Sequence, residues 1–150
     1  MTKIDPIPPG PRLIPYLSVR GAEAALAFYR DVLDAKVSMQ IAMPDGRLGH
    51  AELELPGGVC VYVADEFPEE GFAGPQTRGG TTVSLVLYVE DVDAAAKRAT
   101  DHGAKLDGEV FDAPHGERTA KLVDPFGHRW MFVARTEELS EEEILRRYGQ

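Results

Sequence analysis

The sequence has a single cysteine, Cys60, among its 150 residues. One cysteine forms no disulfide within the chain and supplies neither a paired-cysteine redox centre nor a cysteine-rich zinc site. Cys60 stands in the apolar run VCVYVA, residues 59–64, which favours a small buried side chain, with a reactive thiol as the alternative. The fold must therefore rely on a packed core, for which 43% hydrophobic residues suffice.

Long apolar runs and clustered basic residues are also missing. No segment approaches the roughly 20 apolar residues of a membrane helix, and residues 1–11 hold four prolines where a signal peptide would have an apolar core. The net charge of −9 argues against nucleic-acid binding, which needs clustered Lys and Arg. We expect a cytoplasmic protein without membrane or nucleic-acid partners, whose acidic surface suits neutral or cationic ligands.

The usual catalytic motifs are absent as well. The sequence contains no GxSxG elbow and no glycine-rich phosphate loop. Acyl transfer through a serine elbow and nucleotide binding therefore lack their usual parts.

An internal repeat is what the sequence does contain. The stretch LELPGGVCVYVA, residues 53–64, matches LVDPFGHRWMFV, residues 122–133, at an offset of 69 positions, as from Ala51 to Ala120. Both stretches place a proline and glycine turn between two strand-like segments. The sequence therefore predicts two copies of one structural module.

Hydrophobic periodicity gives both modules the same order of elements. Alternation predicts strands, and the spacing of apolar residues by three and four predicts an amphipathic helix after the first strand of each module. In module one, about 12–64, we predict strands over 12–19, 35–43, 48–55 and 59–64 and a helix over 22–34. In module two, about 81–135, we predict strands over 81–89, 105–111, 118–123 and 129–134 and a helix that begins at the N-cap Asp91 and ends at Gly103.

The remaining segments connect or follow these modules. Residues 65–80, rich in Gly and Pro, are predicted to be a loop, either a plain linker or a lid carrying Phe67 and Phe72. Ser140 and Glu143 form a capping box for a short helix at about 140–148. We expect residues 1–150 to form a single domain.

The repeat, together with AFYRDVLDAKV at residues 27–37 and DPFGHRW at residues 124–130, resembles the vicinal oxygen chelate superfamily, which includes glyoxalase I, extradiol dioxygenases and bleomycin resistance proteins. The resemblance covers roughly residues 12–135. It implies an α+β fold in which two tandem βαβββ modules form a curved mixed sheet around a cavity, followed here by the short C-terminal helix. It also implies a homodimer.

Metal-dependent members of this family hold the ion with four His or Glu side chains. The resemblance places these positions at Ile14, Tyr62, Ser84 and Met131, none of which is a suitable ligand for a hard cation. His50, Glu52 and Glu54 share one strand face, but their spread lets at most two of them converge on an ion. We therefore predict that the protein uses no metal and no cofactor.

The other histidines show less evidence of a catalytic or metal-binding role. His128, beside the DPFG turn, is interpreted as structural. His102 and His115 fall in a helix end and a loop, where the sequence indicates no accompanying constellation.

Strand alternation then defines a cavity wall. Val59, Val61 and Val63 are expected to face the helix, and Cys60, Tyr62 and Ala64 the cavity. The predicted ligand-binding residues are Ile14, Tyr16, Met39, His50, Glu52, Tyr62, Ser84, Tyr88, Thr119 and Met131, with Lys121 as a further polar member. Apolar and aromatic walls with a few polar anchors are typical of a small-molecule pocket, although the same residues would also fill a gap between two closed sheets.

We predict a metal-free protein that binds a small molecule and sequesters a natural product or toxic metabolite, as in antibiotic resistance. The alternative is a lyase, isomerase or dioxygenase-like enzyme acting through His50 and Glu52, with or without a divalent metal. A purely structural module is the third hypothesis.

Overall fold

The computed structural model describes residues 2–150 and divides the chain into two compact units. The boundary lies between Gly74 and Pro75, within the predicted connecting loop. Each unit carries one module of the repeat, with its own sheet and its own covering helix. Across residues 2–150, no helix combines the length and apolar character needed to cross a lipid bilayer.

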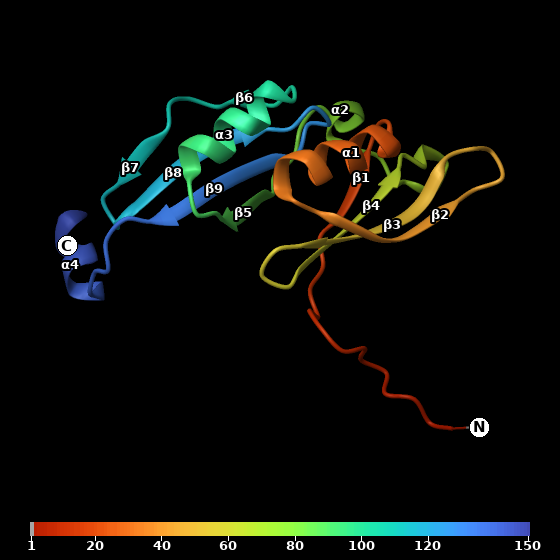
Figure 1. Cartoon of the computed structure of the whole chain (residues 1–150), viewed down its shortest axis with the longest axis horizontal. Helices are drawn as coiled ribbons and strands as arrows, with labels where there is room; N and C mark the ends of the chain where they lie inside the picture. The colour runs from red at the N-terminus through yellow and green to blue at the C-terminus, as the bar shows by residue number, and fades with distance from the viewer. Residues whose placement is uncertain (1) are drawn as a thin grey trace. The chain divides into compact units, whose positions relative to one another are not determined.

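The first unit is a four-stranded mixed sheet with one long helix (Figure 1). Its elements are β1 (Tyr16–Val19), α1 (Ala22–Leu33), β2 (Lys36–Ala42), β3 (Leu48–Leu55), β4 (Val59–Asp65) and the single 3₁₀ turn η1 (Pro68–Glu70). The strand order is β1-β4-β3-β2; β1 runs parallel to β4, and the other pairs are antiparallel. The proline-rich arm before β1 runs away from this sheet.

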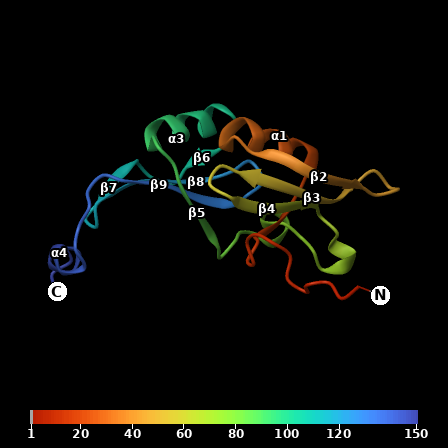
Figure 2. The ribbon, with the colours of Figure 1, turned by 60° about the horizontal axis from the view of Figure 1, so that its bottom comes forward.

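Helix α1 covers one face of the first sheet, and the segment after β4 lies on the opposite face (Figure 2). The apolar stripe of α1 is buried, with Tyr29 at 1% exposure. Beneath it, Leu53, Val61 and Val63 are buried as the alternation predicts, whereas Val59 at the start of β4 is exposed. The intervening residues of β3 and β4 face away from α1, which leaves the opposite face free to carry the polar and aromatic side chains described below.

The second unit repeats this plan. Its elements are α2 (Pro75–Arg78), β5 (Ser84–Tyr88), α3 (Val92–Asp101), β6 (Lys105–Leu106), β7 (Phe111–Ala113), β8 (Glu117–Val123), β9 (Arg129–Arg135) and α4 (Glu141–Arg147). The strand order is β5-β9-β8-β6, with β5 parallel to β9 and β7 also paired to β8. The predicted α+β class with tandem βαβββ modules and a C-terminal helix is confirmed.

Several predicted elements differ in their limits, and three of these differences have a local cause or alter the expected elements. The first strand begins at Tyr16 instead of residue 12, because Pro15 has no N–H and joins the ladder only as the acceptor for Tyr62 N. The strand predicted over 105–111 is split into β6 and β7, since Gly108 adopts φ 82°. The predicted loop 65–80 contains η1 and α2, and Phe67 and Phe72, on either side of η1, are joined by paired backbone hydrogen bonds.

The DPFG turn between β8 and β9 is organised by one buried carboxylate. Asp124, 4% exposed, accepts hydrogen bonds from Phe126 N at 2.9 Å, His128 N at 3.0 Å and Trp130 Nε1 at 2.9 Å. These bonds explain why aspartate begins the motif and tryptophan ends it. The corresponding position in the first unit is the apolar Leu55, followed by an exposed turn at Gly57 and Gly58.

Candidate functional site

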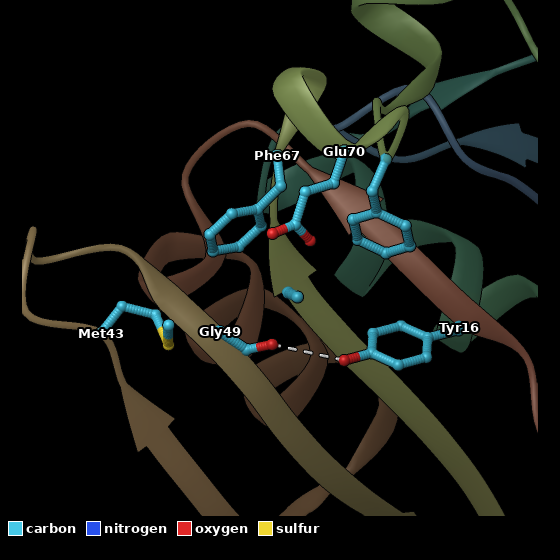
Figure 3. A pocket seen from close by; sticks show the side chains of 7 residues that line it. Tyr16, Met43, Gly49, Phe67 and Glu70 are labelled. Atoms are coloured by element: carbon cyan, nitrogen blue, oxygen red, sulfur yellow. Dashed lines mark hydrogen bonds between the residues drawn. The ribbon is translucent and has the colours of Figure 1, made fainter.

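A pocket of about 470 Å³ opens in the first unit (Figure 3). The lining residues come from β1, the β2–β3 hairpin, β4 and the segment that follows it: Tyr16, Met43, Gly49, Ala64, Phe67, Glu70 and Phe72. Its volume falls within the range of small-molecule sites. Its side chains are mainly aromatic or apolar.

The ring of Tyr16 forms an edge-to-face cluster with three neighbouring rings. The ring of Tyr16 lies 5.2 Å from Phe72, 5.4 Å from His50 and 5.6 Å from Tyr62, measured between centroids. His50 and Tyr62 lie 4.8 Å apart. Parallel pairing of β1 with β4 brings Tyr16 directly opposite Tyr62, and antiparallel pairing of β3 with β4 brings Glu52 opposite Tyr62. Such a cluster fixes the orientation of the Tyr16 ring at the pocket wall.

A chain of hydrogen bonds runs back from the pocket through Tyr16, His50 and Glu52. The Tyr16 hydroxyl lies 2.7 Å from His50 Nδ1, and His50 Nε2 lies 3.1 Å from Glu52 Oε1. An ionised carboxylate only accepts, so Nε2 carries the imidazole proton and Nδ1 accepts from the phenol. The longer contact from the Tyr16 hydroxyl to Gly49 O, 3.4 Å, competes poorly for the same proton.

The electrostatic surroundings keep both tyrosines protonated. Desolvation raises the pKa of Tyr16, and the neighbouring Tyr62 adds to the effect. Desolvation also raises the pKa of Tyr62, as does the charge of Glu52. At neutral pH Tyr16 is therefore a hydrogen-bonding phenol and not a phenolate base.

Arg47 secures the segment that carries Phe67. Its guanidinium carbon stands 3.9 Å from the Phe67 ring centroid, and its nitrogens contact Asp45 Oδ2 at 2.7 Å and Glu69 Oε1 at 2.6 Å. Arg47 also donates to Glu66 O at 3.2 Å. This cation–π and ion-pair arrangement joins the β2–β3 hairpin to the pocket rim. The two carboxylates hold the pKa of Arg47 above its usual value, through the bond to Glu69 first and that to Asp45 second.

The structure gathers four of the predicted site residues, namely Tyr16, His50, Glu52 and Tyr62. Tyr16 and the predicted cavity residue Ala64 line the pocket, and the other three support Tyr16 from the side. Ile14 precedes β1 and is half-buried, while Met39 lies on β2 and is 47% exposed. The remaining predicted residues belong to the second unit: Ser84, Tyr88, Thr119, Lys121 and Met131. Their role in ligand binding stays a prediction.

Sequence reasoning missed Met43, Gly49 and Glu70 as lining residues. Met43 and Gly49 face each other across a hairpin whose strands shift register between Ile41 and Ala42, so simple alternation fails there. In the sequence, Phe67 and Phe72 indicate that residues 65–80 could be a lid, which is the available signal for Glu70 between them.

The expectation for His115 was wrong. Its Nδ1 lies 2.8 Å from the Tyr148 hydroxyl, and its Nε2 lies 3.2 Å from Glu117 Oε2. Glu117 also accepts from the Tyr88 hydroxyl at 2.6 Å. The spacing His-x-Glu, which His115 and Glu117 share with His50 and Glu52, is the signal in the sequence for this cluster, although His115 itself lies in the turn before β8.

The side chains at the positions implied for metal ligands are poorly suited to bind a metal ion. The positions implied by resemblance carry an aliphatic side chain at Ile14, a phenol at Tyr62, a hydroxyl at Ser84 and a thioether at Met131. Both ring nitrogens of His50 are engaged by Tyr16 and Glu52. Within residues 2–150, no three His, Cys, Asp or Glu side chains are grouped so that they could hold a metal ion.

Comparison with known proteins gives a consistent family. The family model described as Glyoxalase/Bleomycin resistance protein/Dioxygenase superfamily matches residues 13–132. An uncharacterized protein of Mycobacterium bovis, Mb0911c, is 36% identical over 139 residues, which cover 89% of this chain and 90% of that protein. The crystal structure of TioX from Micromonospora sp. ML1 matches with a TM-score of 0.64 and 27% identity, over 85% of this chain and 100% of TioX. The fosfomycin resistance protein FosX from Listeria monocytogenes matches in fold, with a TM-score of 0.65 and 17% identity, over 95% of this chain and 99% of FosX. The chain belongs to the Glyoxalase/Bleomycin resistance protein/Dioxygenase superfamily.

Proposed function

We propose that this protein binds a small organic molecule without a metal ion, in the pocket of its first unit, and sequesters it. The observation that carries the proposal is the cavity of about 470 Å³ walled by Tyr16, Phe67 and Phe72. Rings that are already packed and oriented lose little conformational entropy when a ligand arrives, which favours binding at such a site. A natural product or a toxic metabolite is the proposed cargo, in keeping with the resistance proteins that give the superfamily part of its name.

Metal-free binding rests on the chemistry of the donor atoms. Phenol, hydroxyl and thioether groups are poor ligands for the divalent ions that imidazole and carboxylate hold. Elemental analysis of protein purified without chelator should find less than stoichiometric nickel, zinc, iron or manganese after dialysis. A full equivalent of any of these ions would overturn this part of the proposal.

Binding itself can be tested by introducing bulk into the pocket. Ala64 lines the pocket and is 1% exposed, so Ala64→Leu would place a larger side chain in the pocket wall, whereas Ala134→Leu makes the same substitution on β9 of the second unit, away from this pocket. A metabolite and antibiotic panel is screened by the change in melting temperature and by ¹H–¹⁵N chemical shifts. We expect hits that perturb Gly49 and Phe72 amides and that are lost in Ala64→Leu but kept in Ala134→Leu. Circular dichroism checks that both variants fold. Hits that survive in Ala64→Leu would place binding elsewhere.

An enzyme is the second candidate, favoured by the hydrogen-bond chain from Tyr16 through His50 to Glu52. A histidine oriented by a carboxylate suits proton transfer. The raised pKa of Tyr16 weighs against it, because a proton from the pocket would have to pass through a phenol that resists ionisation. Recovery of a bound ligand unchanged favours sequestration, whereas turnover abolished by His50→Ala in a folded variant favours the enzyme.

A homodimer belongs to the same proposal. Strands β1 and β5 each lie at one edge of their respective sheets, and strand edges are common sites of association. Sedimentation equilibrium at micromolar concentration should give a mass near twice the 16.4 kDa of one chain. A mass equal to one chain would remove the dimer from the proposal.

A further inference from the structure

The polar groups of the pocket are hydrogen-bond acceptors. Only two of the seven described lining residues, Tyr16 and Glu70, carry polar side chains, and none carries a positive charge. The carbonyl of Gly49 points toward the Tyr16 hydroxyl, and the Glu70 carboxylate extends into the same space beside Phe67 (Figure 3). A carboxylate and a carbonyl both accept hydrogen bonds and donate none.

His50 and Glu52 make Tyr16 an acceptor too. The Glu52 carboxylate accepts a hydrogen bond from the Nε2–H of His50, so Nδ1 accepts the hydrogen bond that the Tyr16 hydroxyl donates at 2.7 Å. With its single proton directed at His50, the Tyr16 oxygen presents its lone pairs to other donors. His50 and Glu52 are thus positioning residues that set the polarity of a pocket that they do not themselves line.

The Glu70 carboxylate adds a charge that the protein leaves uncompensated. Its neighbour Glu69 is held by Arg47 at 2.6 Å, and Glu66 accepts from Gly74 N at 2.8 Å. Within residues 2–150, the Glu70 carboxylate forms no ion pair. The positive charge of Arg47 is balanced by Asp45 and Glu69, so the rim around Phe67 remains acidic.

We propose that the pocket selects an organic ammonium ion attached to an aromatic or apolar group, with the ammonium N–H groups directed at Glu70, Gly49 O and the Tyr16 oxygen. The rings of Phe67 and Phe72 complement this ligand, since aromatic rings attract cations and pack against apolar groups. The inference rests on the proposed function and gives the chemical class of its ligand. An anionic ligand would meet the Glu70 carboxylate and no cationic lining side chain.

Four probes that share a phenyl ring and differ in their polar group separate charge from hydrogen bonding: benzylammonium, benzyltrimethylammonium, benzyl alcohol and benzoate. Each is titrated to millimolar concentration into the full chain and followed by ¹H–¹⁵N chemical shifts, with Gly49, Glu70 and Phe72 as reporters. Benzylammonium should bind most tightly, about fivefold above benzyl alcohol. Benzyltrimethylammonium keeps the charge without N–H donors and should fall between them, and benzoate should bind most weakly.

Matched variants test the two acceptors that belong to side chains, Glu70 and Tyr16. Glu70→Gln should weaken benzylammonium binding roughly three- to fivefold and leave benzyl alcohol unchanged, whereas Glu142→Gln, on exposed α4, should change neither. Tyr16→Phe should weaken benzylammonium about fivefold. Tyr148→Phe, which also removes a hydroxyl bonded to a histidine Nδ1, should have no effect on binding.

The outcomes distinguish this inference from the function on which it rests. If benzyl alcohol or benzoate binds at the reporters as tightly as benzylammonium, the ligand class is wrong and the pocket function stands. The class is equally overturned if Glu70→Gln behaves like Glu142→Gln. If no probe moves the Gly49, Glu70 and Phe72 resonances at all, the pocket function fails together with the inference.

Discussion

The two halves of this chain each contain a tyrosine, histidine and glutamate joined by hydrogen bonds, with different consequences. In the first half, Tyr16 contacts His50 at 2.7 Å and His50 contacts Glu52 at 3.1 Å. In the second half, Tyr148 contacts His115 at 2.8 Å and His115 contacts Glu117 at 3.2 Å. Of the two tyrosines, Tyr16 lines the pocket of about 470 Å³ and Tyr148 does not. The hydrogen bond between Tyr148 and His115 joins the end of helix α4 to the turn before β8. The same three side chains therefore border a pocket in one half and join a helix to a turn in the other, according to what the tyrosine faces.

The halves also begin their covering helices differently. Helix α3 is capped within the local sequence, because Asp91 accepts from Ala94 N at 3.0 Å. Helix α1 follows Gly21, which has no side chain to cap it, and Ala22 N instead donates to Asp65 at the end of β4, at 2.7 Å. A repeated fold thus keeps its interactions while changing the residues that provide them.

The largest expected effect distinguishes the two turns. Asp124→Ala leaves three donors in and beside the DPFG turn without their acceptor, so we expect a loss of at least about 3 kcal/mol in the free energy of unfolding, measured with urea. Asp124→Asn retains one acceptor oxygen and should lose less. Leu55→Val, at the corresponding position of the first half, should cost only about 1 kcal/mol. A loss below 1 kcal/mol in Asp124→Ala would show that the turn does not depend on the carboxylate.

The second-largest effect on the free energy of unfolding is expected at the N-terminal caps of helices α1 and α3. Asp65 accepts from both Ala22 N and Leu48 N, each at 2.7 Å, so Asp65→Ala should lower the free energy of unfolding by about 2 kcal/mol. Asp91→Ala removes a single local cap and should cost about 1 kcal/mol. Equal losses in the two variants, measured by urea unfolding, would contradict the difference between a tertiary and a local cap.

A smaller effect separates the two tyrosines. Tyr148 is 50% exposed, and its loss should affect the docking of α4 and little else. Tyr148→Phe should speed hydrogen exchange of the amides of α4 several-fold while exchange in β3 and β4 stays unchanged. Tyr16→Phe should instead speed hydrogen exchange in β3 and β4 and leave exchange in α4 unchanged. Faster exchange throughout the chain in Tyr148→Phe would mean that α4 supports the whole second unit.

The smallest effect is electrostatic and confined to α4. Hydrogen bonds from Arg146, then Arg147, lower the pKa of Glu143 to about 2, against an ordinary value of 4.5. A depressed carboxyl pKa stabilises the folded state at pH above about 4.5, and this contribution is lost as the pH falls through about 2. A ¹³C carboxyl titration by NMR should therefore place the midpoint of Glu143 near 2, and Arg146→Ala should raise it. A midpoint near 4.5 in the unmodified chain would mean that these ion pairs do not persist in solution.

Much of the fold could be read from local patterns. The repeat, the helix stripes and the caps at Asp91 and Ser140 depend on neighbours within a few residues, and the structure contains them. The pairing of His50 with Glu52 could be anticipated as well, since residues two apart on a strand share a face. The cap at Asp65 and the partner of His115 could not, because each contact joins residues more than thirty positions apart.

The family and the order of elements could be recognised from the sequence alone, as could the presence of Ile14, Tyr62, Ser84 and Met131 at the positions that the family resemblance implies for metal ligands. Periodicity and turn chemistry act over short distances, so they leave a legible trace in the chain. Glu70, Gly49 O and Tyr16 meet at one cavity only in the folded chain (Figure 3), and the same folding places the Tyr16 hydroxyl 2.7 Å from His50 Nδ1. That arrangement arises from strand register and from a loop folded back by the Phe67 and Phe72 bridge, which bring together residues that no local pattern relates.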